Sequence, residues 1–314
     1  MLRFILSRIG MAVPTVFLVA VVVFFLIRLV PGDPAALLLG DMASPESVAA
    51  LRSDLGLDKN ILTQFAIWLT SVLQGDFGTS ITTKEQVAHL IIERFKVSAG
   101  IVLVAVALAS LVAVPAGFIA ALRQNSRLDF TLVSIAALLL SIPTFWLGLV
   151  ILLIFGLKLG WLPVVGYVSV AEDPSRGLLY VLMPILTLFL HEIGVLLRMA
   201  RASALEVLRL DYITHARAKG LPERTVLWRH VFPNAFAPTL TLIGLVLGNM
   251  LGGIAVVETV FTIPGLGRLL VDAIFGRDYP VIQGCLLFIA VIYVLVNLIV
   301  DLCYPLFDPR VKIT

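Results

Sequence analysis

The chain contains little charge, cysteine or histidine, and each shortage narrows what the protein can be. Charged residues make up 14% of the 314 residues, against about 25% in typical soluble domains. The four histidines are widely separated in the predicted topology, so no metal cluster is expected. The dipeptide Gly-Lys does not occur, which excludes the phosphate-binding loop of nucleotide hydrolases.

Only two cysteines are present, Cys285 and Cys303, and both fall in the last apolar run of the sequence. They are separated by about five turns of one predicted helix, which disfavours a disulfide between them. Cysteines in such a run behave as small buried hydrophobic residues.

Hydrophobic residues, in contrast, make up 60% of the chain, and its mean hydropathy is +1.06. Six apolar runs reach the roughly 20 residues that a helix needs to cross a bilayer. These runs are 9–30, 97–122, 130–157, 178–197, 235–257 and 284–304. Prolines inside these runs include Pro14, Pro115, Pro143 and Pro184, and a packed bundle tolerates each of them as a kink. The sequence therefore predicts an all-α integral membrane protein with six transmembrane helices.

The first apolar run follows Arg3 and Arg8, as the core of a secretory signal would. It is longer than a signal core, and no Ala-x-Ala cleavage site follows it. We therefore interpret residues 1–30 as the N-terminus and the first transmembrane helix.

The basic residues near the six runs predict an orientation. If the N-terminus is cytoplasmic, thirteen Lys and Arg residues flank the runs inside, against four in the two short outside loops. We therefore expect a plasma-membrane protein with both termini in the cytoplasm. This bias also accounts for the net charge of +3, so nucleic-acid binding is not needed to explain it.

Residues 31–96 form a polar segment outside the membrane, and residues 97–314 form a core with five of the six transmembrane helices. In the outside segment, Ser44 is the expected N-cap of one short helix and Ile61–Leu73 the expected second. A turn at 75–78 and a third helix at 84–94 then lead to the second transmembrane helix. This segment either caps the bundle or provides a docking surface for an outside protein.

The stretch 198–229 between the fourth and fifth runs carries seven Lys and Arg residues. Leu205, Leu208, Tyr212 and Ala216 form an apolar stripe at helical spacing, and Gly220 is placed to end that helix. Pro222 then opens a second helix. The stretch predicts a helix, a tight turn and a helix at the cytoplasmic face, serving either as a partner's docking surface or as an amphipathic segment on lipid head groups.

Several motifs in this chain resemble those of permease subunits of ATP-binding-cassette importers, in particular the peptide/nickel class. The strongest is Asp211-Tyr212-Ile213 followed by Ala216-Arg217-Ala218-Lys219-Gly220-Leu221. Further matching motifs are Gly32-Asp33-Pro34, Gly75-Asp76-Phe77-Gly78-x-Ser80, Glu258-Thr259-Val260-Phe261, Pro264-Gly265-Leu266-Gly267, Arg277-Asp278-Tyr279-Pro280, Asn297-Leu298-x-x-Asp301 and Asp308-Pro309-Arg310. The resemblance covers nearly the whole chain and is similar to the first of the two permeases, the dipeptide, oligopeptide, glutathione and nickel type.

The resemblance implies that the chain forms half of a translocation path together with a second permease subunit. Two cytoplasmic ATPase subunits would hydrolyse ATP and bind the cytoplasmic loop, while a periplasmic or lipid-anchored binding protein would deliver the substrate. No cofactor is then expected in this chain. The residues expected to couple it to the ATPases are Asp211, Tyr212, Thr214, Ala216, Arg217, Lys219, Gly220 and Leu221.

Two features of the predicted helices are candidates for the translocation path or its gate. Gly244, Gly248 and Gly252 repeat at every fourth position beside Asn249, a pattern that serves close helix packing or a sliding face. Glu192 is an acidic residue inside a transmembrane helix, where charge is costly and often functional. It either meets an ammonium group or a metal cation, or pairs with Arg198 or a partner subunit.

Asp76, Glu258 and Asp272 lie in or beside the outer loops, where they either contact the binding protein or hold loop geometry. Small peptides are the expected substrate, with nickel, glutathione and opine-like solutes as alternatives. An autonomous secondary transporter is a further alternative, although no inverted repeat is visible. An intramembrane enzyme would need a nucleophile and base on facing helices, which the scattered serines and histidines do not provide.

Overall fold

The computed structural model describes residues 2–28, 39, 44–54 and 58–307. Within these ranges the chain is helical, and the only β-type pairing is an isolated bridge between Thr79 and Gln86. The principal helices are α1 (Leu2–Arg28), α3 (Pro45–Asp54), α4 (Ile61–Leu73), α5 (Val87–Leu122), α6 (Arg127–Ser141), α7 (Thr144–Ile151), α8 (Pro174–Leu208), α9 (Asp211–Ala218), α11 (Phe232–Gly253), α12 (Ala255–Val260), α13 (Leu266–Phe275) and α14 (Tyr279–Phe307). The motifs at 32–34 and 308–310 lie outside the described residues.

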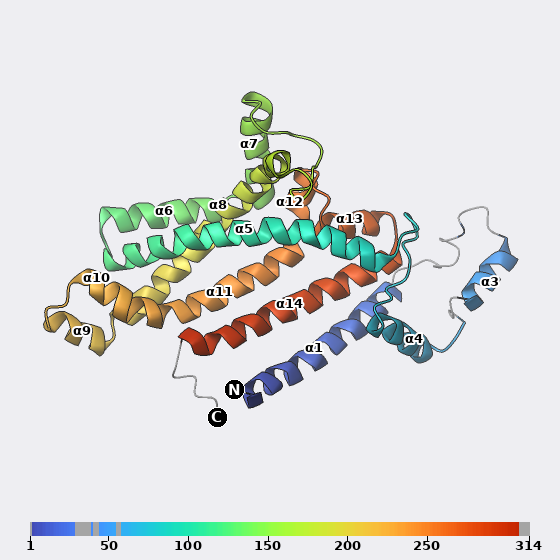
Figure 1. The fold of residues 1–314 in the computed structure, drawn as a ribbon, viewed down its shortest axis with the longest axis horizontal. Coiled ribbons are helices and arrows are strands. Elements are labelled where there is room, and N and C mark those ends of the chain that lie inside the picture. The colour runs from blue at the N-terminus through green and yellow to red at the C-terminus, as the bar shows by residue number, and fades with distance from the viewer. Residues whose placement is uncertain (1, 29–38, 40–43, 55–57, 308–314) are drawn as a thin grey trace.

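Five helices are long and apolar enough to cross a membrane: α1, α5, α8, α11 and α14. Figure 1 shows α5, α11, α14 and α1 in this order across the bundle, and α11 also packs against α8. Prolines at 14, 115 and 184 lie inside continuous helices, as expected. The prediction of an all-α membrane protein is confirmed.

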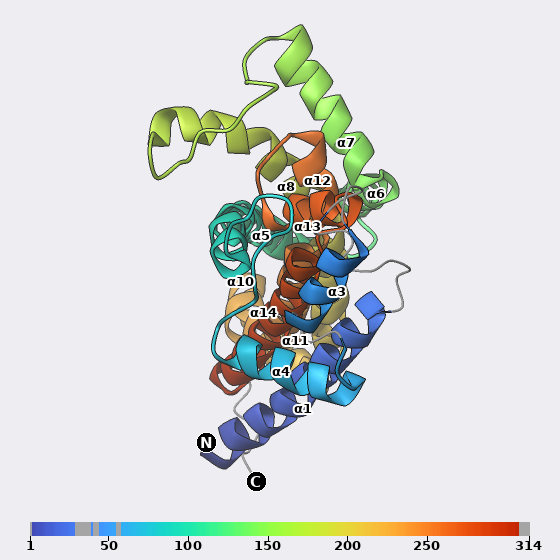
Figure 2. The ribbon, with the colours of Figure 1, turned by 90° about the vertical axis from the view of Figure 1, so that its right-hand side faces the viewer.

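The third predicted transmembrane segment is not one helix. The run 130–157 divides into α6 and a second helical piece formed by α7 and the π-helix η1 (Leu152–Lys158), with a bend of 95° between them. Pro143 lies at the break, where its carbonyl oxygen accepts a hydrogen bond from the Leu147 N–H at 3.0 Å and so begins α7. Counted as one bent segment, this pair gives the sixth predicted crossing. Figure 2 shows α7 projecting away from the bundle.

The outside segment begins largely as predicted. The Ser44 hydroxyl accepts a hydrogen bond from the Ser47 N–H at the start of α3, and α4 has the predicted bounds. The helix expected at about 84–94 is present from Val87, but it is the first part of α5, which runs without interruption to Leu122. Helix α4 is fixed to α1 by Arg28, whose guanidinium donates to Gln64 Oε1 at 2.9 Å and lies 3.4 Å above the Phe24 ring.

Three groups of buried apolar residues divide the bundle along its length. The largest lies in the middle, where α5, α8 and α11 meet. A second group joins α9 to the adjacent ends of α5, α8 and α11, and a third joins α5, α13 and α14 near the opposite end. The central group lies next to the cavity described below, and the other two fix the loops at the two ends.

Candidate functional site

The basic loop between α8 and α11 forms two short helical pieces on either side of a turn, and its first piece is separate from α8. Helix α8 ends at Leu208 and α9 begins at Asp211, so the predicted apolar stripe from Leu205 to Ala216 is divided between two helices. After the turn, α10 (Glu223–Thr225) and the π-helix η2 (Val226–Val231) lead directly into α11. The predicted helix, turn and helix are present.

Helix α9 is held against the bundle by its apolar side. Ile213 and Ala216 are 0% and 7% exposed. They belong to the same buried group as Phe118 of α5, Val207 of α8 and Val231 of η2. This buried group therefore joins α9 to α5, α8 and η2.

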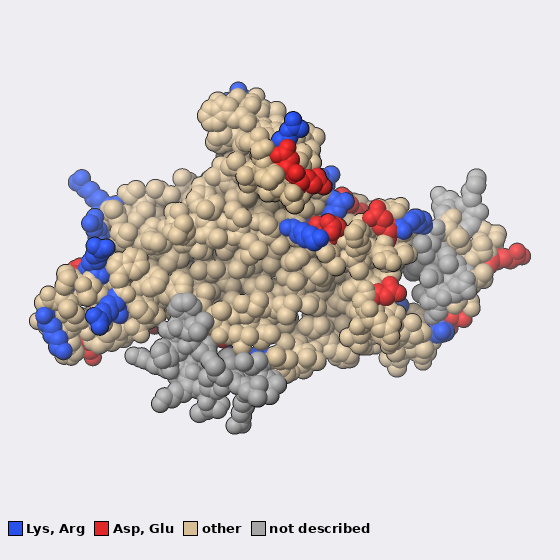
Figure 3. All heavy atoms as spheres, in the orientation of Figure 1, with Lys and Arg blue, Asp and Glu red and all other residues tan. Residues whose placement is uncertain are grey.

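The opposite side of this loop is polar and exposed. Among the predicted coupling residues, Asp211, Thr214, Arg217, Lys219 and Leu221 are exposed, while Tyr212 is half-buried. Arg217 pairs with Glu223 across the turn, with Nε 2.8 Å from Oε1. Figure 3 shows Lys and Arg side chains gathered at the end of the molecule that carries α9 and α10.

Gly220 is required by the turn itself. Its φ of +79° lies in the left-handed region that favours glycine, and its N–H donates to the Arg217 carbonyl oxygen at 2.9 Å. Beyond its chain neighbours, no described residue lies within 4 Å of where a Cβ would be added. The surface around Gly220 is therefore open to a partner.

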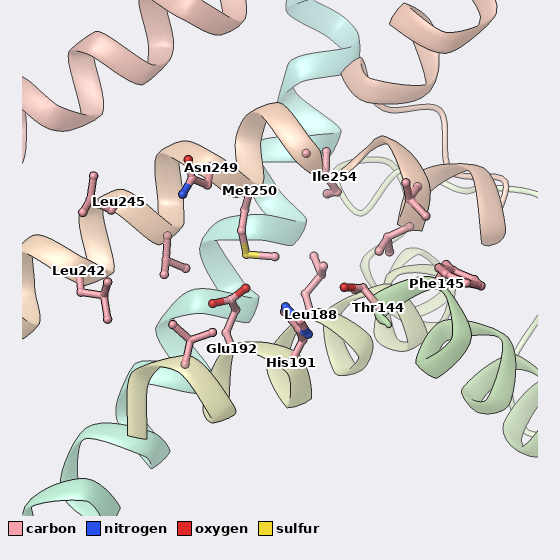
Figure 4. A pocket seen from close by; sticks show the side chains of 15 residues that line it. Thr144, Phe145, Leu188, His191, Glu192, Leu242, Leu245, Asn249, Met250 and Ile254 are labelled. Atoms are coloured by element: carbon pink, nitrogen blue, oxygen red, sulfur yellow. The ribbon is translucent and has the colours of Figure 1, made fainter. Parts of the chain in front are cut away.

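A cavity of about 510 Å³ lies between α7, α8 and α11 (Figure 4). Two of the predicted path residues, Glu192 of α8 and Asn249 of α11, line it together. Its other lining residues are Thr144, Phe145, Leu188, His191, Val195, Leu242, Leu245, Val246, Met250, Gly253, Ile254, Val256 and Val257. Most of these residues are apolar, so the few polar groups dominate the chemistry of the cavity.

Glu192 is 5% exposed, and its Oε2 has no hydrogen-bond partner among the described residues. The predicted alternative of an ion pair with Arg198 is not found in the described part of the chain, and Arg198 is exposed. His191 also has a buried Nδ1 without a partner in that part. Two adjacent residues of α8 therefore present unsatisfied polar atoms in or beside the cavity.

The glycine stripe of α11 faces α14 and not the cavity. A Cβ at Gly244 would overlap Val300, and one at Gly248 would lie 2.7 Å from Tyr293 Cδ2. A Cβ at Gly252 would lie 3.3 Å from Ile289 Cγ2. The structure favours the interpretation of this stripe as a helix-packing face.

Among the outer candidates, Glu258 is buried and held by its own chain. It is 1% exposed, and its carboxylate accepts hydrogen bonds from the Ser98 hydroxyl at 2.5 Å and from the Arg268 N–H at 2.9 Å. Asp272 is exposed and lies 3.7 Å from Arg268 Nε, and Asp76 accepts from the Gly78 N–H in an exposed turn. Asp76 and Asp272 are therefore accessible on the surface of this chain, whereas the hydrogen bonds of Glu258 hold loop geometry.

Sequence reasoning missed the partner of Asp278. One oxygen of this buried carboxylate accepts from the hydroxyls of Ser80 and Thr82, each at 2.5 Å. Burial by itself would raise the pKa of Asp278, but these hydrogen bonds outweigh it and hold the pKa below its usual value. The contact joins two motifs of the resemblance that are about 200 residues apart, a separation that no local pattern reveals.

A second missed contact lies near the other end of the bundle. Arg201 of α8 binds the carboxylate of Asp129 of α6 through two hydrogen bonds, of 2.6 and 2.8 Å. Arg8 of α1 likewise pairs with Asp301 of α14 at 3.1 Å. These pairs tie the ends of neighbouring helices together.

Apolar helices long enough to cross a bilayer, joined at one end by a polar loop, define a multi-pass membrane protein. Residues 113–313 match the family described as binding-protein-dependent transport system inner membrane component. Residues 1–102 match the N-terminal membrane component of the same systems. The chain belongs to this family and is a peptide-type permease of an ATP-binding-cassette importer, as the motifs predicted.

Similar proteins align with the chain from end to end. It is 40% identical over 312 residues to the glutathione transport system permease protein of Salmonella choleraesuis, with 99% of both chains covered. It is 37% identical over 333 residues to the di/tripeptide transport system permease protein of Pseudomonas aeruginosa, again with 99% of both covered. The same identity relates it to the dipeptide transport system permease protein of Alkalihalophilus pseudofirmus, over 99% of this chain and all of that one.

Proposed function

We propose that this chain forms one half of the translocation path of an importer for di- and oligopeptides. A second permease subunit supplies the other half, two ATPase subunits bind the cytoplasmic loop, and a binding protein delivers the substrate. The observation that carries this proposal is the loop 209–231, which is anchored to the bundle by buried apolar residues and presents a polar face outward. End-to-end similarity to peptide permeases supports the substrate class.

The proposed orientation places this loop and both termini in the cytoplasm, within the inner membrane. The gathering of Lys and Arg at the end with α9 and α10 supports it, because basic loops remain on the cytoplasmic side. In this orientation the accessible Asp76 and Asp272 lie outside, where a binding protein would dock.

In this proposal, ATP hydrolysis takes place in other subunits. The sequence has no phosphate-binding loop of the Gly-Lys-Ser/Thr type, so ATP would be hydrolysed by the separate ATPases and no cofactor would be bound here. The role of this chain would be mechanical, converting movement of α9 into movement of the bundle. Glutathione, opine-like solutes and nickel are alternative substrates for the same machinery.

The test is a bulky substitution on the exposed side of the coupling loop. Replacing Ala218, an exposed helical residue of α9, by Trp adds bulk where the ATPase would dock without straining the backbone. We expect Ala218→Trp to abolish peptide uptake by the complete transporter in liposomes, while leaving membrane insertion intact. The same result is expected for Gly220→Trp, where the left-handed backbone adds local strain to the effect of bulk.

Gly220→Ala separates these two effects, since it carries the strain without the bulk. Leu111→Trp is a matched control for the Trp substitutions, since Leu111 is 72% exposed in the middle of α5 and belongs to neither loop region. Wild-type uptake in Ala218→Trp would contradict the coupling role. Solute flux through the purified chain with no ATPase present would instead support an autonomous transporter.

A further inference from the structure

The cavity between α7, α8 and α11 contains a carboxylate with one oxygen that no described residue hydrogen-bonds. Glu192 is more than nine-tenths buried, its Oε2 makes no hydrogen bond to any described residue, and Figure 4 shows its carboxylate extending toward Met250 of α11. Elsewhere in the described chain, the buried carboxylates of Asp129, Glu258 and Asp278 each accept hydrogen bonds. Glu192 is therefore unlike the other buried acids described.

No lining residue offers the opposite charge. The polar residues of the cavity besides Glu192 are Thr144, His191 and Asn249, and no Lys or Arg is among the lining residues of the described chain. An isolated carboxylate inside a membrane bundle is costly unless a cation or hydrogen-bond donor meets it. A cation that meets this carboxylate would therefore come from outside the described chain.

The rim of the cavity is accessible. Phe145 and Val256 at its edge are 48% and 51% exposed, and Asn249 is also exposed. The volume of about 510 Å³ lies within the range of roughly 300–1,000 Å³ typical of small-molecule sites. An external group can therefore reach Glu192 through this opening.

The lining chemistry favours an ammonium group over a metal ion. In the part of the chain that the structure describes, no group of three or more His, Cys, Asp or Glu side chains could hold a metal. A transition metal would find only Glu192 and His191 here, whereas an ammonium ion needs one carboxylate and a few neutral acceptors. Apolar walls with a few fixed polar groups suit an amphipathic organic solute better than a bare ion.

We propose that Glu192 binds the terminal ammonium group of the transported peptide within this cavity, and so selects substrates with a free amino terminus. This inference rests on the proposed function. Asn249 lies on the facing helix, where its side chain can hydrogen-bond a peptide carbonyl or N–H group. The apolar residues Leu188, Val246 and Met250 would contact the remainder of the peptide.

The experiment uses the complete transporter in liposomes, with a binding protein saturated with trialanine or with N-acetyl-trialanine. Glu192→Gln removes the charge and keeps the shape, whereas Glu192→Asp keeps the charge. Glu93→Gln is the matched control, because the Glu93 side chain is 52% exposed on α5 and does not line the cavity. Copurification with the second permease and the ATPases checks that each variant assembles.

We expect Glu192→Gln to slow trialanine uptake by about tenfold, as loss of a charge-assisted hydrogen bond would. Glu192→Asp should retain a substantial part of the uptake, and Glu93→Gln should match the wild type. The wild type should favour trialanine over the acetylated peptide, and Glu192→Gln should lose that preference. The comparison of Gln with Asp on trialanine alone does not depend on how the binding protein treats the acetylated peptide.

Wild-type trialanine uptake by Glu192→Gln would overturn this inference and leave the proposed function intact. Loss of the second permease from that variant would overturn it in another way, since Glu192 would then pair with the partner subunit. Uptake of Ni²⁺ that depends on Glu192 would assign the cavity to a metal cation instead. Absence of any peptide uptake by the wild-type transporter would contradict the proposed substrate itself.

Discussion

Two buried glutamates differ in what surrounds them. Glu258, in the outer loop region, accepts hydrogen bonds from Ser98 and Arg268, and the Ser98 hydroxyl oxygen in turn accepts one from the Leu266 N–H at 2.8 Å. Glu192, in the central cavity, has a carboxylate oxygen with no partner among the described residues. Burial alone therefore does not distinguish these two acids, but the hydrogen-bond donors around each of them do.

Among substitutions at or beside these two glutamates, Glu258→Met is expected to change the free energy of unfolding most. Methionine has a similar length but accepts no strong hydrogen bond, so the Arg268 N–H and the Ser98 hydroxyl lose their acceptor. Two unsatisfied buried donors should lower the free energy of unfolding by about 3 kcal/mol. Thermal unfolding of the purified chain in detergent, followed by tryptophan fluorescence, measures the loss. Glu93→Met, at an exposed glutamate, should leave the unfolding temperature unchanged.

A smaller effect is expected from Gly265→Ala. The added Cβ would overlap the Glu258 carboxylate and push it away from its donors, although Gly265 has an ordinary negative φ. Overpacking of this kind should cost about 2 kcal/mol of unfolding free energy. Gly100→Ala is the control in the same unfolding assay, because nothing lies within 4 Å of its added Cβ. Equal stability of the two alanine variants would show that the carboxylate is not held tightly.

Glu192→Met is expected to have the smallest effect on the free energy of unfolding, and to increase it. Removing an unsatisfied buried carboxylate from an apolar cavity should raise the free energy of unfolding of the isolated chain by about 1 kcal/mol. The same unfolding assay compares it directly with Glu258→Met. A loss of stability as large as that of Glu258→Met would mean that Glu192 supports the fold, and the contrast between the two acids would disappear.

The membrane-spanning helices could be predicted from the sequence because length and hydropathy determine them. Pro143 shows the limit of that reasoning. Pro115 and Pro184 lie inside continuous helices, whereas Pro143 begins α7 after a bend of 95°. All three lack a backbone N–H, so their local chemistry is the same. The difference depends on how the neighbouring helices pack, which the local sequence does not encode.

Some residues of the candidate site could be selected from the sequence, but their long-range contacts could not. An acid within an apolar run is visible in one sequence, so Glu192 could be selected without a structure. The partners of Glu258 and Asp278 lie 160 and 198 residues away, and only folding brings them together. The glycine stripe was recognisable as a packing face, but its partner α14 was not. The coupling function of the loop stays a prediction.

The position of α11 has a mechanical consequence. Its first residue follows η2 without a break, one of its sides is seated on α14 through glycines, and another lines the cavity. A displacement of the loop would therefore move α11, and α14 would move with it because the two helices are in close contact at the glycines. The residues of α11 that line the cavity would move as well. Access to the cavity could then change through rigid-body motion of α11, with no hinge between the loop 209–231 and the cavity-lining residues of this helix.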